Sequence, residues 1–193
     1  MQFREAGNYI LDKLAKELPS YLSYHNVNHA KDVFKAAERL AEQENVSHHD
    51  KELLLTAAWY HDSGFLKAPQ GHEEESCSIV HQVLPLYGYN TNDIENVCGM
   101  IMATKMPQSP KNHLEEILAD ADLDYLGRDD FFTIGDKLYQ ELLPSGTVNN
   151  EKEWNEWQLE FLTRHRYFTK TAQLTRKKKK EDNLEQIKRI LKK

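Results

Sequence analysis

A histidine and an aspartate stand next to each other, at His61 and Asp62, where an apolar segment ends. The segment before them, residues 53–59, has the composition of a helix buried on nearly all sides, and Gly64 is suited to ending it. A buried imidazole beside an ionised carboxylate costs free energy unless another group pairs with both, and a cation would do so. Because a His-Asp dipeptide often occurs by chance, the prediction of a metal site requires further ligands elsewhere in the chain.

Two histidines lie four residues apart near the start of an earlier predicted helix, at His25 and His29. Asn26 or Asn28 could cap this helix, and if its first turn includes both histidines they share one face. His29 also lies four residues before Val33, on the side that the apolar residues mark as buried. The alternative for each is a core histidine hydrogen-bonded to a carbonyl, but two histidines on one inward edge favour a functional site.

A further carboxylate is predicted in the helix over residues 114–125, where aspartates occur at every second position. Asp120 and Asp124 are four residues apart and share a face, whereas Asp122 points among apolar neighbours. A carboxylate in apolar surroundings needs a compensating partner more than an exposed one does. Asp122 is therefore the candidate ligand, while Asp120 and Asp124 either accept hydrogen bonds from a ligating histidine or are solvated.

Two more residues are candidates for contact with a substrate. His72 follows the loop after the His-Asp pair, so it either faces the same site or belongs to the helix that starts there. Lys105 ends the predicted helix 91–104, where it could reach an anionic substrate or simply complement the helix dipole.

The elements that must position these residues are helices, and the predicted fold class is all-α. The chain has 193 residues, of which 39% are hydrophobic and 29% charged, and it contains only 8 glycines and 6 prolines. This composition is typical of one soluble globular domain with long helices. Apolar residues recur at helical spacing over residues 2–18, 26–41, 50–61, 72–87, 91–104, 114–125, 128–143 and 151–174, and again from residue 176 to the end.

Charge is distributed unevenly along the chain. Residues 1–163 carry 13 Lys+Arg against 28 Asp+Glu, whereas residues 164–193 carry 12 against 3. The acidic body argues against general nucleic-acid binding. Residues 176–193 are predicted to form a basic amphipathic helix that docks on the body (residues 1–175) with its lysines in water, although such a helix could also touch a membrane or nucleic acid.

Cellular context can also be predicted from the composition. Cys77 and Cys98 are the only cysteines and form no disulfide framework, which favours a reduced, cytoplasmic protein. No apolar run approaches the roughly 20 residues that span a bilayer, and the first residues lack the layout of a signal peptide. We therefore expect neither nucleic acid nor membrane as a partner.

Taken together, these residues match the pattern H…HD…D, which resembles the HD-domain superfamily of metal-dependent phosphohydrolases. Residues 25–33 also resemble the first-histidine segment of class I cyclic-nucleotide phosphodiesterases, and residues 120–124 are similar to the DAD-type segment of small bacterial HD hydrolases. The resemblance covers roughly residues 20–130. It implies an all-α fold in which different helices present the metal ligands, which would be His29, His61, Asp62 and Asp122.

The resemblance also implies catalytic roles. His25 matches the phosphodiesterase histidine that acts as a general acid toward the leaving oxygen. The chain lacks the histidine that phosphodiesterases carry a few residues after the His-Asp pair, so the number of metal ions and the substrate stay open. Two imidazoles and two carboxylates suit Mn, Fe, Ni, Co or Zn better than Mg. An octahedral ion with these four ligands keeps two positions for water and a phosphoryl oxygen.

The function predicted from the sequence is metal-dependent hydrolysis of a phosphate ester, of a nucleotide or a similar small molecule. The catalytic residues would be His25, Asp62 and Lys105, with a divalent metal ion as the cofactor. One alternative is a non-catalytic HD module that uses its metal site to bind a nucleotide or a protein partner. A second is an all-α interaction module in which the basic C-terminal helix is the functional part.

Overall fold

The computed structural model describes residues 1–192, and within that range the chain forms nine α-helices, three short 3-10 helices and no strand. The predicted all-α fold class is thus confirmed. The elements in chain order are α1 (Phe3–Glu17), α2 (Val27–Gln43), α3 (His48–Tyr60), η1 (Ser63–Leu66), α4 (His72–Val83), η2 (Leu84–Tyr87), α5 (Thr91–Thr104), α6 (His113–Asp122), η3 (Asp124–Gly127), α7 (Phe131–Leu142), α8 (Glu151–Arg164) and α9 (Lys170–Ile190).

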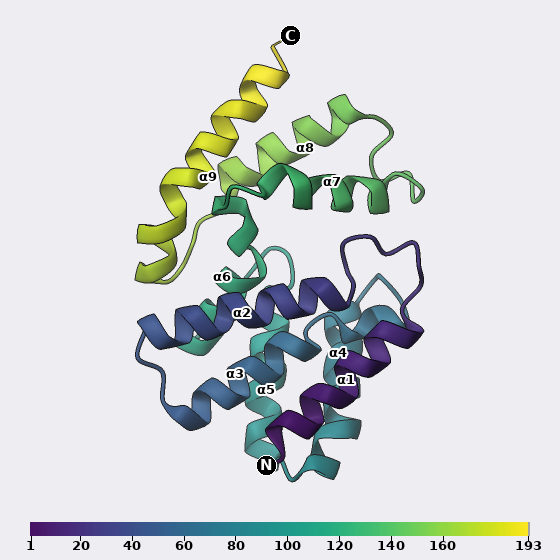
Figure 1. The fold of residues 1–193 in the computed structure, drawn as a ribbon, viewed down its shortest axis with the longest axis vertical. Helices are drawn as coiled ribbons and strands as arrows, with labels where there is room; N and C mark the ends of the chain where they lie inside the picture. The colour runs from purple at the N-terminus through teal and green to yellow at the C-terminus, as the bar shows by residue number, and fades with distance from the viewer. Residues whose placement is uncertain (193) are drawn as a thin grey trace.

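The helices are arranged in two groups around two hydrophobic clusters (Figure 1). The larger cluster is built mainly from α1 to α6, with fully buried residues such as Ile10, Leu40 and Leu54. The smaller cluster lies among η3, α7, α8 and α9 and includes Phe131 and Ile187. α6 lies at the junction of the two groups.

Short polar side chains fix where several helices begin. Asn26 caps α2, with its side chain accepting a hydrogen bond from the Asn28 amide at 2.9 Å, and Ser47 caps α3. Asn90 caps α5, because its side chain and that of Asp93 form a reciprocal capping box.

The helix predicted over residues 151–174 is two helices. The chain leaves α8 after Arg164 and starts α9 at Lys170, with Thr169 as the cap. The Asp120 carboxylate binds the extended segment between them, accepting hydrogen bonds from the backbone amides of Phe168 (2.9 Å) and Thr169 (2.8 Å). A buried carboxylate from a distant helix therefore stabilises the break, and local periodicity contains no sign of it.

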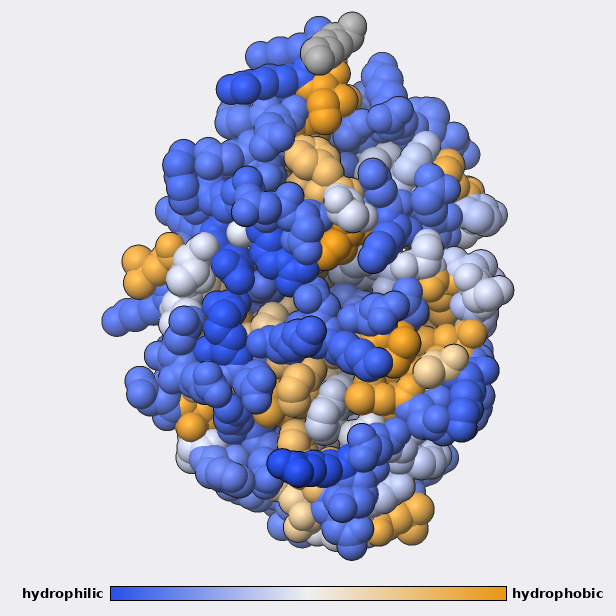
Figure 2. Space-filling view, viewed as in Figure 1, coloured by the Kyte–Doolittle hydropathy of each residue, from blue (hydrophilic) through white to orange (hydrophobic). Residues whose placement is uncertain are grey.

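The basic C-terminal residues are part of a longer helix. α9 runs through the boundary predicted between residues 175 and 176, and it packs against η3 and α8. Asn183 and Ile187 are buried at this contact. Hydrophilic residues cover the outer surface where α9 lies (Figure 2), but Lys180 is only 5% exposed, contrary to the expectation that the lysines stay in water.

None of the helices in residues 1–192 combines the length and the apolar character needed to cross a membrane.

Candidate metal centre

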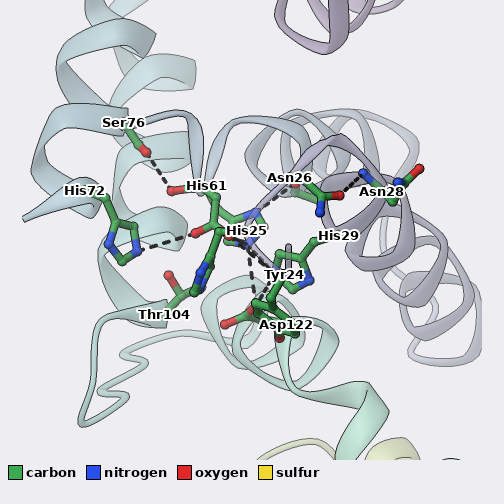
Figure 3. A network of polar contacts seen from close by, with 12 residues as sticks. Tyr24, His25, Asn26, Asn28, His29, His61, His72, Ser76, Thr104 and Asp122 are labelled. Carbon is green, nitrogen blue, oxygen red and sulfur yellow. Dashed lines mark hydrogen bonds and ion pairs between the residues drawn. The ribbon is translucent and has the colours of Figure 1, made fainter. Parts of the chain in front are cut away.

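Three separate helices bring the H…HD…D residues together. His29 lies in the first turn of α2, His61 caps the C-terminal end of α3 with Asp62 next to it, and Asp122 is the last residue of α6. All of these residues lie in the first or last turn of a helix or directly after it. Their side chains can therefore converge on one point between the two groups of helices. Figure 3 shows the His29, His61 and Asp122 side chains around this point.

The distances among these side chains are those of a shared ligand set. His29 Nε2 lies 3.1 Å from Asp122 Oδ1, 3.4 Å from Asp62 Oδ2 and 3.3 Å from His61 Nε2. His61 Nε2 lies 3.2 Å from Asp62 Oδ2 and 3.5 Å from Asp122 Oδ1. Ligand atoms of His29, His61 and Asp122 all fall within 4.8 Å of one another, a spacing that one ion can bridge.

The surroundings of Asp62 indicate that the proposed ligand atoms fit a cation. Its Oδ2 atom is buried and accepts no hydrogen bond of good geometry, although two imidazole nitrogens face it at 3.2 and 3.4 Å. Burial would raise the pKa of Asp62, but His61 and the other nearby histidines hold it well below its usual range. Burial likewise opposes protonation of His61, and the two carboxylates raise its pKa well above the usual value. A divalent ion would replace these protons between the ligands.

The protein orients the His61 ring by a hydrogen bond on its other side. Nδ1 lies 3.0 Å from the backbone oxygen of Ala58. Because a carbonyl can only accept, Nδ1 carries a proton, which leaves Nε2 as the atom that faces the carboxylates and could bind a metal ion. Ser76 fixes the backbone here, donating to the His61 carbonyl at 2.6 Å and accepting from the Gly64 amide at 2.8 Å (Figure 3).

Gly64 does not end α3, which stops at Tyr60, but has a steric role inside η1. A Cβ atom on Gly64 would lie 2.0 Å from the carbonyl oxygen of His72, so only glycine lets η1 pack this closely on the start of α4. This contact brings His72 to the site. Its Nε2 lies 3.4 Å from Asp62 Oδ1, and its Nδ1 lies 2.9 Å from the Pro69 carbonyl oxygen.

His25 lies beside the ligand set, before the cap of α2. Its ring stacks on Phe65, with centroids 4.2 Å apart, and its Nδ1 is hydrogen-bonded to Glu141 Oε1. Glu141 Oε2 also accepts from the backbone amides of Tyr24 (2.8 Å) and His25 (3.0 Å). Burial lowers the pKa of His25, but the bond to Glu141 and the site's carboxylates outweigh it and raise the pKa above its usual value.

Glu141 is the residue that sequence reasoning missed. It is buried at the end of α7, more than a hundred residues after His25, and no motif surrounds it. A signal was nevertheless present. Glu141 follows Leu138 at three-residue spacing and so lies near the apolar stripe of its helix, where a carboxylate needs a partner.

Three other candidates lie away from the ligand set. Lys105 pairs with Glu74 and is 45% exposed. Asp120 binds the chain between α8 and α9, as described above. Asp124 accepts hydrogen bonds from Arg39 (2.6 Å) and Arg176 (2.7 Å), so it joins α2 to α9. The two aspartates are therefore neither solvated nor bonded to a histidine of the site.

A cavity of about 260 Å³ borders the site at His29 and Tyr24. Basic side chains of Arg128 and Lys137 line its far wall, although Arg128 is already paired with Asp32 and Asp130. Its volume lies just below the range of about 300–1,000 Å³ that is typical of small-molecule pockets.

Comparison with known proteins now bears on this geometry. The family model described as "HD domain" matches residues 26–124, which include all four proposed ligands. The chain belongs to the HD-domain family. This confirms the resemblance to the HD-domain superfamily that the sequence shows. No curated protein sequence matches the chain.

Two solved structures share the fold of this HD-domain chain. One, from an uncultured Thermotogales bacterium, is described as a predicted HD superfamily hydrolase. It is 20% identical, with a TM-score of 0.65, and the match covers 97% of this chain and 90% of that one. The other is a structural genomics target from Lactobacillus plantarum. It is 19% identical, with a TM-score of 0.68, and the match covers 97% of this chain and 95% of that one.

Proposed function

We propose that the protein is a metal-dependent phosphohydrolase that cleaves a phosphate ester of a nucleotide or a similar small molecule. The observation that carries the proposal is the buried Asp62 Oδ2 atom, which accepts no hydrogen bond and faces the His29 and His61 nitrogens. In this proposal His29, His61, Asp62 and Asp122 hold one divalent ion. Mn, Fe, Ni, Co or Zn suits this mixed set better than Mg.

The ion would lower the pKa of water and draw charge from a phosphoryl oxygen when bound. The chain's own residues then have separable tasks. His61 is oriented by the Ala58 carbonyl so that its Nε2 faces the ligand set. His25, protonated and held by Glu141, would donate a proton to the leaving oxygen. Phe65 packs on the His25 ring and keeps water from one of its faces.

His72 is proposed to contact the substrate or to orient Asp62, since its Nε2 lies 3.4 Å from Asp62 Oδ1. Lys105 is paired with Glu74 on the surface. This pair has to open before Lys105 can contact a substrate.

The test is phosphate release from a panel of nucleotides, cyclic nucleotides and generic phosphate esters, with Mn, Co, Ni, Zn or Mg added in turn. We expect metal-dependent turnover that disappears in Asp62→Ala and persists in Asp12→Ala, whose exposed carboxylate pairs only with Lys16. Tight metal binding without turnover on any substrate would instead support a non-catalytic binding module. Turnover that survives Asp62→Ala would refute the proposed site.

A further inference from the structure

The four lysines at residues 177–180 have different environments on α9. Lys178 lies 2.9 Å from Asp182 Oδ1, and Lys179 lies 2.5 Å from Asp129 Oδ1. Lys177 and Lys180 instead line a cavity of about 580 Å³ between α8 and α9. Within residues 1–192 neither of these two forms an ion pair with a carboxylate. Two of the four charges are therefore unneutralised and share one cavity.

Arg166 adds a third positive charge to the same wall. Its guanidinium donates to the backbone oxygens of Thr163 (2.6 Å) and His165 (2.8 Å), and it has no carboxylate partner in the described part of the chain. Glu181 is the one acidic residue among those lining the cavity. The cavity therefore concentrates positive charge, although residues 1–163 carry more than twice as many acidic as basic side chains.

Lys180 is the buried member of the group, at 5% exposure. Its Nζ donates to the backbone oxygens of Leu162 (3.3 Å) and His165 (2.5 Å), at the C-terminal end of α8, and lies 3.4 Å from His165 Nδ1. These carbonyls orient the ammonium without carrying a full charge that would neutralise it. Burial, followed by the positive charge of Arg166, lowers the pKa of Lys180 to about 8. An additional anion in the cavity would offset this cost.

We propose that the cavity between α8 and α9 binds a small polyanion with two or more adjacent phosphate groups, at a site separate from the metal centre. Three cations against one carboxylate favour a ligand with at least two negative charges. Arginine and lysine are the side chains that bind phosphate oxygens best, so Arg166 and Lys177 would donate to the ligand while the buried Lys180 adds its charge. The volume lies in the range of small-molecule sites. None of the proposed metal ligands lines this cavity, so the inference does not depend on the proposed function.

A small anion fits better than a nucleic acid. A nucleic-acid surface needs a basic stripe along several phosphates, whereas these charges converge on one concavity. The other two lysines of the run are neutralised by Asp182 and Asp129. The surrounding body is acidic and would repel a long polyanion.

Calorimetric titration of the full chain with inorganic pyrophosphate and tripolyphosphate tests the proposal. A chelator is present, so phosphate cannot bind through an ion at the metal centre. We expect saturable binding, and a rise in melting temperature beyond that given by sodium chloride at equal ionic strength. Lys177→Gln and Arg166→Gln should each weaken binding about tenfold or more. Lys178→Gln is the matched control within the lysine run and should leave affinity unchanged.

Lys177 and Arg166 are exposed, so their variants should fold, and circular dichroism checks this. Lys180→Met then tests the buried position and should abolish binding. No saturable binding to the wild-type chain would overturn the proposal. Unchanged affinity in the Lys177→Gln/Arg166→Gln double variant would also overturn it. The same holds if Asp62→Ala loses binding while the double variant retains it. Binding of a single-stranded oligonucleotide without competition from pyrophosphate would identify a nucleic-acid surface instead.

Discussion

At the scale of single residues, the candidate centre combines groups that are unstable when buried alone. Asp62 has an oxygen with no hydrogen-bond donor, and His29 and His61 have nitrogens only 3.3 Å apart. Such groups destabilise a fold unless a cation binds between them. The arrangement therefore favours a functional explanation over a structural one, since an apolar core could fill the same space at lower cost.

His61→Ala and Asp62→Ala should each lose the bound metal and the activity while keeping the helical content. Each removes one of the four proposed ligands, and the helices around the site pack through other residues. Elemental analysis after dialysis against the metal measures the metal content, and circular dichroism measures the helical content. A full metal complement in either variant would show that the ligand assignment is wrong.

Glu141→Gln should keep the metal and slow turnover by about tenfold. His25→Ala should slow turnover by a factor of about 10²–10⁴. Glu141 raises the pKa of His25, so His25 stays protonated to a higher pH. Activity that needs protonated His25 falls as the pH rises through this pKa. Removing the Glu141 charge lowers the pKa, and the alkaline limb of the pH–rate profile should shift to lower pH. If the alkaline limb of the pH–rate profile does not shift, Glu141 has no role in the proton transfer.

At the scale of helices and their connections, Asp120 decides where one predicted helix becomes two. It accepts three hydrogen bonds, from the Phe168 amide and from the amide and hydroxyl of Thr169. Burial raises the pKa of Asp120 to about 6, although these bonds act in the opposite direction. The segment between α8 and α9 is thereby fixed to the end of α6, which also carries Asp122.

Asp120→Ala should destabilise the protein by about 1–3 kcal/mol or more, because it leaves buried donors without an acceptor. Urea unfolding measures this loss. Metal content per folded molecule should be unchanged, since Asp120 does not face the ligand set. A variant of normal stability that binds metal poorly would instead place Asp120 behind a ligating histidine.

The contact between α8 and α9 should also make stability depend on pH. The pKa of Lys180 is about 8 in the folded protein and about 10.4 in an unfolded chain. Between these values the unfolded chain binds more protons, so this residue's contribution makes stability rise as the pH increases from about 8 to 10.4. The free energy of unfolding is measured against pH for Lys180→Met and for Lys178→Met, which removes an exposed lysine and serves as the control. Identical pH profiles of the two variants would contradict the prediction.

At the scale of the whole molecule, the candidate centre lies where the two groups of helices meet. The α2, α3 and α6 helices supply the proposed ligands, while α7 supplies Glu141. Arg39, Arg128 and Arg176 converge on Asp124 and join α2, η3 and α9. The C-terminal helix therefore contributes to the framework around the site.

Deleting residues 176–193 should lower the melting temperature strongly. The deletion removes Asn183 and Ile187 from a buried contact and takes Arg176 from Asp124. Activity should fall together with stability, because α7, which carries Glu141, packs in the hydrophobic cluster that the deletion exposes. Differential scanning calorimetry and phosphate release measure the two effects. A stable, fully active truncated chain would show that α9 is an independent appendage.

The sequence by itself determined the features that depend on local spacing. Helical periodicity predicted an all-α fold, and the order His29, His61-Asp62, Asp122 predicted both the family and a convergent set of side chains. Near-continuous apolar character before His61 was enough to predict its burial. These features could be read from the chain because a helix repeats every 3.6 residues and a metal site needs particular residue types.

Only the tertiary structure decided the pairings between residues far apart in the chain. It placed Glu141 on His25, Asp120 on the α8–α9 connection and Asp124 on three arginines. It also buried Lys180, one of four consecutive lysines that are equivalent by composition. A charged side chain's environment depends on which distant helix packs over it. Periodicity within one helix cannot reveal that, because the partner lies in another element of the fold.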